Sequence, residues 1–507
     1  MAINKIDSNI TGLRYAEEKD LRELPPNPVF YLLEPNSYND FGGQISTIAR
    51  NPINPSRQRQ KGVTTDLDAS GGFQQDLTMN NSIRLFQGFF FADIREPKTT
   101  APMNSDPIAL TAVTGADKKV TAASGLAGWV KGHIVRLSGF STRANNKVCT
   151  VASNSLAGEV VFDQALADET PPAAAKMETV GIMFADGDVK IELNANLVRL
   201  VSTTFDMKSL KLVPGSWIFL GGDETNAKFA KNKGFARISV INEHYIEFDK
   251  TDWKGEAEVG TGKAIKMFFG EVLKNEADPE LIKRRTYHVE RTLGHDADGQ
   301  MSEYLVGAVP NELKINIAQA DKITMDMSFV AVDNEQRTGA QGLKTGTRPY
   351  QKPASAFNTS SDFARIKLAL VDEENSAPKP LFAYATEMNL TLNNNVTPNK
   401  AIGVLGAFDT SAGTFEVGGS LTAYFNDVTS AQAVRNNGNV TIDIIMLKKN
   451  EGMVWDIPLL SLGNGRLNVE QDQAITLPLD TNAAECKFNH TLLFQRFTYL
   501  PDVAGGV

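Results

Sequence analysis

The sequence predicts a mainly β protein with two tandem β-sandwich or barrel modules, one short helix in each, and two small inserted β-barrel repeats. Three observations support this fold class. Apolar and polar residues alternate with a period of two in several stretches, a motif is duplicated at two distant places, and helix signals are few. A period of two gives a strand one buried and one wet face, which is typical of antiparallel sheets.

Composition narrows the functional classes. A chain of 507 residues is too long for one core, so several domains are expected. The net charge of −9 argues against a protein that grips nucleic acid by neutralising phosphates, and it fits a surface that DNA passes without sticking. Cys149 and Cys486 are the two cysteines, which indicates no disulfide scaffold and favours synthesis in a reducing cytoplasm. Neither a secretory signal pattern nor an apolar run of about 18 residues occurs, so no membrane insertion is expected.

The first segment, residues 1–28, is polar and ends in Pro25-Pro26-Asn27-Pro28. Prolines stiffen the chain and remove backbone donors, and the segment offers little apolar surface for burial. It is therefore predicted to be an extended N-terminal arm that reaches a neighbouring subunit. A disordered leader is the alternative.

The duplicated motif combines proline, basic residues, Gly-Val and an Asp-x-Ser-x-Gly turn before a phenylalanine. The first copy contains Pro55, Arg57, Arg59, Lys61, Gly62, Asp68, Ser70, Gly72 and Phe73, and the second contains Pro398, Lys400, Gly403, Asp409, Ser411, Gly413 and Phe415. A duplicated module without catalytic residues suggests a building block. The basic run of the first copy favours contact with an adjacent subunit, with a solvated loop and DNA contact as alternatives.

A helix signal follows each copy. Asn80-Asn81-Ser82 is expected to cap a helix from Ile83 to about Phe89, and Asn426-Asp427 to cap one that ends near Arg435. The Phe89-Phe90-Phe91 triplet is expected in the core at a module junction, with a subunit interface as the alternative.

A second duplication lies downstream of the first helix. Gly132–Gly139 is similar to Gly215–Gly222, Asn146-Lys147 to Asn232-Lys233, and Phe162-Asp163 to Phe248-Asp249. These matches predict inserted β-barrel repeats over residues 99–195 and 196–275. Such an insertion is expected to decorate a surface, with a place in the main body as the alternative.

Alternating strands complete the domain plan. They are predicted at Leu313–Ile317, at Ile323–Phe329 after a turn over Ala318–Lys322, and at Met388–Leu392. Module 1 then comprises residues 29–95 and 285–335, residues 336–377 form a loop-rich linker, and module 2 spans residues 378–501.

Signals for catalysis and metal binding are weak. The five histidines show no i, i+4 pair and no His-Glu-x-x-His. His295–Gly299 lacks the later glutamate of a calcium loop, and no Gly-x-Ser-x-Gly occurs. Cys149 is expected in a core. The chain is therefore expected to be no enzyme and to use no cofactor or metal, although a triad with distant partners stays open.

Several stretches resemble a known family. Ala49–Phe73, Gln87–Ala92, Ala401–Val417 and Ile457–Val469 are similar to the tail tube (major tail) proteins of long-tailed, non-contractile bacteriophages. The resemblance covers about residues 29–95 and 285–501 and leaves out the insertion.

The resemblance implies a structural virion protein. Such proteins fold as a β-sandwich or rolled barrel with one helix, and their sheets join across subunits to line a channel wide enough for a DNA duplex. Two modules per chain imply trimeric, pseudo-hexameric rings, with hexameric rings as the alternative. The implied partners are other copies of the chain, tape measure, tail terminator and tail-tip proteins, and passing double-stranded DNA. The implied location is the virion tail, after assembly in the host bacterial cytoplasm.

Site residues follow as expectations. Subunit-interface candidates are Arg57, Arg59, Lys61, Asp68, Phe73, Asp409 and Phe415. Lumen candidates are Glu312, Asp326, Glu416 and Asp443, which would repel DNA, although the sequence leaves open which face each occupies. The inserted barrels would project outward, because a bulky insertion would block a channel.

Two other classes compete with this interpretation. A capsid or decoration protein is one, but a capsid protein would be expected to show a long helix, and none is predicted. A tail-tip carbohydrate-binding or hydrolytic protein is the other, and it would need exposed aromatic residues or paired carboxylates in a cleft. Trp129, Trp217 and Trp253 of the insertion are the candidate aromatic residues for such carbohydrate binding.

Overall fold

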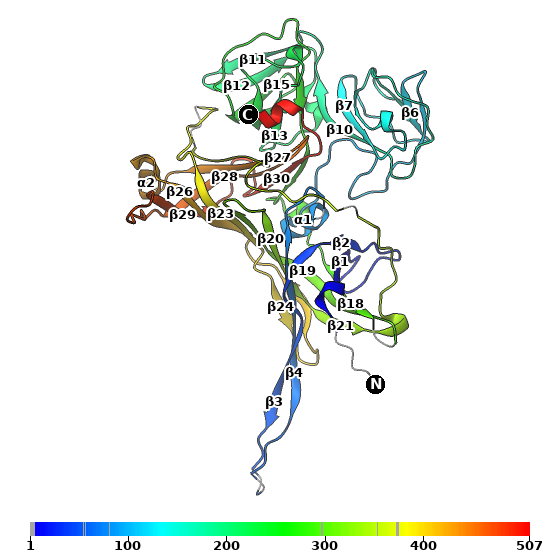
Figure 1. Cartoon of the computed structure of the whole chain (residues 1–507), viewed down its shortest axis with the longest axis vertical. Helices are drawn as coiled ribbons and strands as arrows, with labels where there is room; N and C mark the ends of the chain where they lie inside the picture. Colours follow the sequence, from blue (N-terminus) through cyan, green and yellow to red (C-terminus); the bar gives the residue numbers. More distant parts are fainter. Residues whose placement is uncertain are drawn as a thin grey trace.

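The computed structural model describes residues 6–506 except 54, 56, 81, 296, 297, 352 and 372–374. Within these residues the chain is mainly β, as predicted, with the α-helices α1 (Ile83–Phe90) and α2 (Val428–Arg435). Figure 1 shows a central β body, a separate β region at one end and a long hairpin that projects from the other.

The body contains two sets of strands. The first set comprises β1 (Gly12–Glu17), β2 (Tyr31–Leu33), β3 (Pro35–Arg50), β4 (Gln60–Asp76), β18 (Tyr287–His295), β19 (Gln300–Ala318), β20 (Thr324–Ala331) and β21 (Asp333–Arg337), together with α1. The second set comprises β22 (Phe363–Leu370), β23 (Ala385–Asn393), β24 (Thr397–Lys400), β25 (Ala407–Ser411), β26 (Glu416–Tyr424), β27 (Val440–Lys448), β28 (Glu451–Asn464), β29 (Thr476–Ala483) and β30 (Leu493–Phe497), together with α2.

The same order of strand pairing occurs in both sets. The order β3-β4-β20-β19 matches β23-β26-β29-β28, and β1-β18-β19-β21 matches β22-β27-β28-β30. In each set one long strand, β19 or β28, runs from one sheet into the other. Each set is therefore a two-layer sandwich with a second-layer sheet, β1-β18-β19-β21 or β22-β27-β28-β30.

One strand pair fuses the two sandwiches. The end of β19 pairs with β23, so a continuous sheet runs β3-β4-β20-β19-β23-β26-β29-β28, here called the polar-faced sheet. The main apolar core fills the space behind it. In this core α1 lies at the junction, where the ring centroid of Phe86 is 5.6 Å from that of Trp455 and 5.3 Å from that of Phe494.

Strand register corrects the alignment of the duplicated motif. Ser70–Phe73 of β4 lie opposite β20 in the way that Gly418–Leu421 of β26 lie opposite β29. The second motif copy instead spans β24, β25 and the loop before β26. Asp68 and Asp409 therefore hold different places, because Asp-x-Ser-x-Gly is general turn chemistry that recurs at unrelated positions.

Two domain borders also differ from the sequence-based plan. The predicted arm is wrong for Gly12–Glu17, which form β1, pair with β18 and bury Leu13 and Tyr15. The predicted linker is wrong for Phe363–Leu370, which form β22 and pair with β27. Both strands lie next to polar segments that the sequence-based plan assigned to an arm and a linker, and strand propensity alone is a weak signal against such surroundings.

The two helices begin where predicted, but their caps differ. The Asp427 carboxylate accepts a hydrogen bond from the Thr429 amide, as a capping side chain does. The Ser82 hydroxyl makes no such bond with the backbone of α1 and instead accepts one from the Gln75 side chain. Asn81 lies outside the described residues.

The insertion contains two copies of another pairing scheme. Its strands are β5 (Leu110–Thr114), β6 (Lys119–Ala122), β7 (His133–Ser138), β8 (Val148–Thr150), β9 (Glu159–Val161), β10 (Lys176–Met183), β11 (Val189–Asn194), β12 (Leu197–Ser202), β13 (Trp217–Leu220), β14 (Gly234–Ile241), β15 (Tyr245–Thr251), β16 (Lys266–Phe268) and β17 (Glu271–Lys274). The pairings β5-β6-β9 and β10-β7-β8 recur as β11-β12-β15 and β16-β13-β14.

These pairings close no barrel within the described residues, where the strand orders stay open at both ends. The pairing of β10 with β16 also joins the two repeats in one sheet. The border between the repeats also moves. Ile182 of β10 and Val189 of β11 belong to the core of the second repeat, whereas Met177 of β10 belongs to the core of the first. The border therefore lies within β10 and not after residue 195.

Candidate functional site

One face of the polar-faced sheet is open and polar. In β19, Leu313 and Ile315 point into the core, while Lys314 and Asn316 point to the opposite side. The same alternation holds along β20, β23, β26 and β29. Period-two patterning therefore gives the sheet a single apolar face, which the core covers, and a single polar face, which is open.

The open face is rich in carboxylates, amides and hydroxyls. Its paired positions carry Asp76, Glu312, Asp326, Glu387, Glu416 and Asp480 as acids, with Lys314 as a base among them. Acidic groups thus outnumber basic ones across both sets. The face presents negative charge and small polar groups and little apolar surface to a partner.

Hydrogen bonds between neighbouring strands hold these side chains flat on the sheet. Asp326 accepts from Gln74 at 3.0 Å and from Asn316 at 2.6 Å. Asn389 donates to the Ser420 hydroxyl at 2.6 Å. Polar groups fixed to each other in this way are less available to grip a passing ligand, because their bonding capacity is already used.

The lumen candidates divide into two groups. Glu312, Asp326 and Glu416 lie on the open polar face. Asp443 does not, because its side chain is fully buried and pairs with Lys250 of the insertion and Arg365 of β22. Burial raises the pKa of Asp443, but Arg365 and Lys250 outweigh it and lower the pKa to about 2. Asp443 is thus a correction to the expected set: it is a buried ion-pair partner.

Most of the interface candidates from the first motif copy lie near the tip of the long hairpin, and one lies in the core. Arg57, Arg59 and Lys61 are exposed near the tip of the β3–β4 hairpin, which extends away from the body (Figure 1). Phe73 is fully buried in the core, stacked on Phe329 with ring centroids 6.1 Å apart, so its expected role at a subunit surface is wrong.

The remaining candidates make contacts within the chain. Asp68 pairs with Lys400. Asp409 pairs with Arg284, with 3.0 Å between the carboxylate and guanidinium atoms. Phe415 packs on the main core, with its ring centroid 6.3 Å from that of Phe90. These contacts join the two sets to each other.

Several residues of the site escaped sequence reasoning. Asp76, Glu387 and Asp480 lie on the open face. The alternation of apolar and polar residues in β23 and β29 could have indicated Glu387 and Asp480. Asn394 had no local signal. Its buried amide donates to Phe89 O at 2.9 Å and to Pro310 O at 3.1 Å, and so ties the second set to the first.

The polar-faced sheet has two open edges. Within the described residues, β3 pairs with β4 on one side, and Ser461–Asn464 of β28 pair with β29 on one side. Open strand edges are ready to pair with another chain. The second set also exposes large apolar side chains, since Tyr384, Val428 and Val469 expose 73%, 61% and 69% of their surface.

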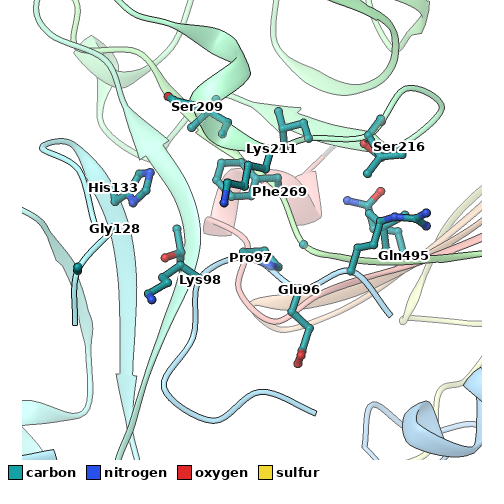
Figure 2. A pocket seen from close by; sticks show the side chains of 18 residues that line it. Glu96, Pro97, Lys98, Gly128, His133, Ser209, Lys211, Ser216, Phe269 and Gln495 are labelled. Atoms are coloured by element: carbon teal, nitrogen blue, oxygen red, sulfur yellow. The ribbon is translucent and has the colours of Figure 1, made fainter. Parts of the chain in front are cut away.

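A pocket of about 340 Å³ lies away from this face, where the insertion meets the body (Figure 2). Glu96, Lys98, His133 and Lys211 are among the residues that line it. Burial raises the pKa of Glu96 to about 7 and lowers that of His133 to about 4. Among the described residues no cluster of His, Cys, Asp or Glu is arranged to hold a metal ion.

The tryptophans of the insertion do not form a glycan platform. Trp129 and Trp217 are fully buried, and Trp253 is 6% exposed. None of the helices that the structure describes is both long enough and apolar enough to span a bilayer.

Comparison with known families gives a match over most of the chain. The family model described as phage tail tube protein matches residues 8–483, which includes the insertion and so extends beyond the stretches that carry the sequence resemblance. No curated protein matches the chain.

Proposed function

The chain belongs to the phage tail tube protein family and is a structural protein of the virion tail, and we propose that copies of it assemble into stacked rings whose channel conducts DNA into the host. The observation that carries this proposal is the open polar face of the polar-faced sheet. In the proposed ring this face lines the channel.

The charge of the face suits passage of DNA. Asp326, Glu387 and Asp480 would repel phosphates, and the few cations, such as Lys314, would offer little counter-charge. A surface that neutralises few phosphates binds DNA weakly, because phosphate contacts supply most of non-specific affinity. The insertion covers the second-layer sheet and not the polar face, so it would lie on the outside of the ring.

The junction between the two sets offers a pattern for the contact between copies. The free edge of β28 is the counterpart of the β19 edge that pairs with β23, and β3 is the counterpart of β23. Glu312 pairs with Asn393 inside the chain, and their counterparts are Gly463 and Gln44. We therefore expect Gly463 of one copy to lie opposite Gln44 of the next.

This pairing leads to a closed ring. Each copy contributes two sandwiches, and a contact between copies that repeats the internal contact would continue the same rotation. We propose trimeric rings with pseudo-hexameric symmetry, with hexameric rings as the alternative outcome.

The basic hairpin tip has a partner under the same scheme. The β24–β25 hairpin is the counterpart of the β3–β4 extension, and its Lys400 pairs with Asp66 and Asp68 of the first set. Glu416 is the counterpart of Asp68, since it lies opposite Asn393 as Asp68 lies opposite Gln44. We propose that Arg57, Arg59 or Lys61 of one copy pairs with Glu416 of the next.

Both hairpins also expose apolar side chains that suit contacts between stacked rings. Ile53 and Val63 expose 106% and 55% of their surface, and Ile402 and Phe408 expose 106% and 51%. A two-stranded ribbon is marginal in water by itself, so it gains stability from a further surface. Tape measure, tail terminator and tail-tip proteins are the further proposed partners, with assembly in the host bacterial cytoplasm.

Electron microscopy of the purified protein tests the proposal. The expected result is hollow tubes with a regular ring repeat, alone or after addition of tail-tip initiator, and the averaged cross-section then counts the copies. Closed shells, or compact particles that stay separate in the presence of the initiator, would contradict it.

A further inference from the structure

The insertion is attached by sequence to one set and packed on the other. It leaves the first set after α1 and returns to it at β18. Its last strand, β17, nevertheless pairs with β30 of the second set, with Glu271 opposite Arg496 and Lys274 opposite Leu493. The Arg496 guanidinium also holds the Glu271 carboxylate through two hydrogen bonds of 2.6 and 2.7 Å.

A buried ionic cluster joins the second repeat to the second set. Arg237 of β14 lies 2.9 Å from the Asp249 carboxylate and 3.0 Å from that of Asp456 in β28. Lys250 of β15 pairs with Asp443 of β27. The side chains of Lys250, Asp443 and Asp456 are fully buried.

Arg365 of β22 extends the cluster to a further strand. It pairs with Asp252, which follows β15, and lies 2.7 Å from Asp443. Buried charges hold only where partners are well placed, so the cluster admits few relative positions of the insertion and the second set.

Apolar packing and backbone hydrogen bonds seal the same contact. The Gln495 side chain accepts from Trp217 N and donates to Trp217 O, both at 2.7 Å. Phe235 of the insertion packs on Phe497 with ring centroids 5.9 Å apart. Both aromatic rings belong to an apolar core that combines residues of the insertion with residues of β27, β28 and β30.

The connection to the first set is also held firmly. The two crossing segments pair through Arg95 and Val272, whose amides and carbonyls exchange hydrogen bonds of 2.8 Å. Arg285 donates to Ala92 O at 3.0 Å and to the Glu17 carboxylate at 3.1 Å. The pocket in Figure 2 lies beside this crossing, and Gln495 of the second set also lines it.

From these contacts we propose that the insertion is a brace that fixes the angle between the two sandwiches of one chain. The β19–β23 pairing, α1 and the shared apolar core already join the sandwiches on the near layer. The insertion adds a second attachment on the far layer, and two separated attachments restrict the angle between the sandwiches more than one does. In an assembled ring the brace would set the curvature, because the angle inside each copy fixes where the next copy binds. This second step rests on the proposed function.

Two point variants and one control test the brace. Arg237→Gln breaks the cluster, and Gln495→Leu removes the bonds to Trp217 at similar volume. Arg199→Gln is the matched control, because it breaks an ion pair with Glu247 inside the second repeat at 2.7 Å and does not touch the second set. Hydrogen exchange of β17 and β30 reports whether each variant opens the contact.

The angle is measured in the unassembled chain. Spin labels at Glu23→Cys and Glu485→Cys report the distance between the sets, and both native cysteines are buried and escape labelling. We expect a narrow distance distribution in the parent and in Arg199→Gln. In Arg237→Gln or Gln495→Leu, called the brace variants, we expect a distance distribution at least twice as wide wherever hydrogen exchange of β17 is faster than in the parent. If Arg237→Gln does not fold, Gln495→Leu carries the test.

An equally narrow distribution in a variant whose β17 and β30 exchange freely would overturn the brace. This result would not depend on tube formation, so it is distinct from a failure of the proposed function. Where the parent forms tubes, the brace variants are expected to form tubes of mixed diameter, and tubes of the parent diameter from an opened variant would overturn the link to curvature.

Discussion

Glu290 and Asp443 occupy equivalent positions in the two second-layer sheets, and each is a fully buried carboxylate. Glu290 pairs with Tyr304 across β18 and β19, as Asp443 pairs with Asp456 across β27 and β28. Their counter-charges come from different parts of the chain. Arg348, from the segment after β21, holds Glu290, and Lys250 of the insertion holds Asp443. The equivalent buried carboxylate is therefore neutralised by a cation from a loop in one sandwich and by a cation from the insertion in the other.

Removal of the loop cation is expected to destabilise the first sandwich. Arg348→Ala leaves the Glu290 carboxylate buried without its cation, and breaking such a pair costs about 3–5 kcal/mol. Hydrogen exchange of the β18 and β19 amides measures this loss. Lys19→Ala is the control, since its pair with Asp20 is exposed and contributes at most about 1 kcal/mol. A loss in Arg348→Ala no larger than in the control would contradict the assignment.

The second repeat is expected to lose stability in acid through Glu258. Burial raises the pKa of this carboxyl, but hydrogen bonds from the Ala230 and Lys231 amides, Lys263 and Asn232 outweigh it and lower the pKa from 4.5 to about 2. A folded-state pKa below the unfolded one gives stability that is complete above pH 4.5 and is lost as the pH falls toward 2.

Glu258→Gln tests this acid response. At pH 7 the variant is expected to be less stable by about 1–3 kcal/mol, and its stability is expected to vary less between pH 4.5 and 2. Glu256→Gln is the control, because its pair with Lys231 is exposed. Thermal unfolding of the second repeat across this pH range is the measurement, and parallel pH profiles of parent and Glu258→Gln would refute the prediction.

The proposed contact between copies predicts a specific cross-link. Gln44→Cys and Gly463→Cys in one chain are expected to form a disulfide between copies on mild oxidation of assembled tubes, because facing residues of paired strands bring Cα atoms within about 4.4–6.8 Å. Non-reducing electrophoresis would show covalent oligomers. Asn36→Cys with Gly463→Cys is the register control. Cross-linking of the control but not of the test pair would rule out this register.

The polar face predicts a charge effect on DNA. Glu387→Lys with Asp480→Lys is expected to leave tubes intact but to make them retain DNA at low salt, with release as salt rises, because each new phosphate contact adds about −0.9 to the slope of log affinity against log salt. Glu192→Lys, on an exposed strand of the insertion, is the control. DNA retention equal in both variants would contradict a channel lined by this face.

The hairpin tip predicts an assembly defect without a folding defect. Arg57→Ala with Arg59→Ala and Lys61→Ala removes exposed charges, so the free energy of unfolding is expected to change by less than about 0.5 kcal/mol per site. Sedimentation is expected to show fewer tubes and more free chains. Glu416→Gln is expected to weaken assembly in the same direction. Normal tube yield from the triple variant would exclude the proposed pairing.

Local pattern was sufficient for much of the fold. Leu313, Ile315 and Ile317 alternate with polar residues because their strand has one buried and one open face, and the predicted strand is part of β19. The helix at Val428–Arg435 follows from the Asp427 cap. The same reasoning fails for β27, because residues 440–446 are buried on both faces and show no alternation. The sequence around Asp443 therefore does not indicate that its side chain is buried.

By itself, the sequence determined the class of the protein and its strands of period two, because these depend on residues along one strand. Strand pairing in the folded chain then placed Glu312, Asp326 and Glu416 on one shared polar face. Only the tertiary structure decided that β1 and β22 complete the second layers, that Asp443 is buried, and that the insertion is packed on the second set. The physical reason is distance along the chain. Counter-charges such as Lys250 and Arg348 lie far in sequence from the acids that they neutralise, so folding alone brings them together.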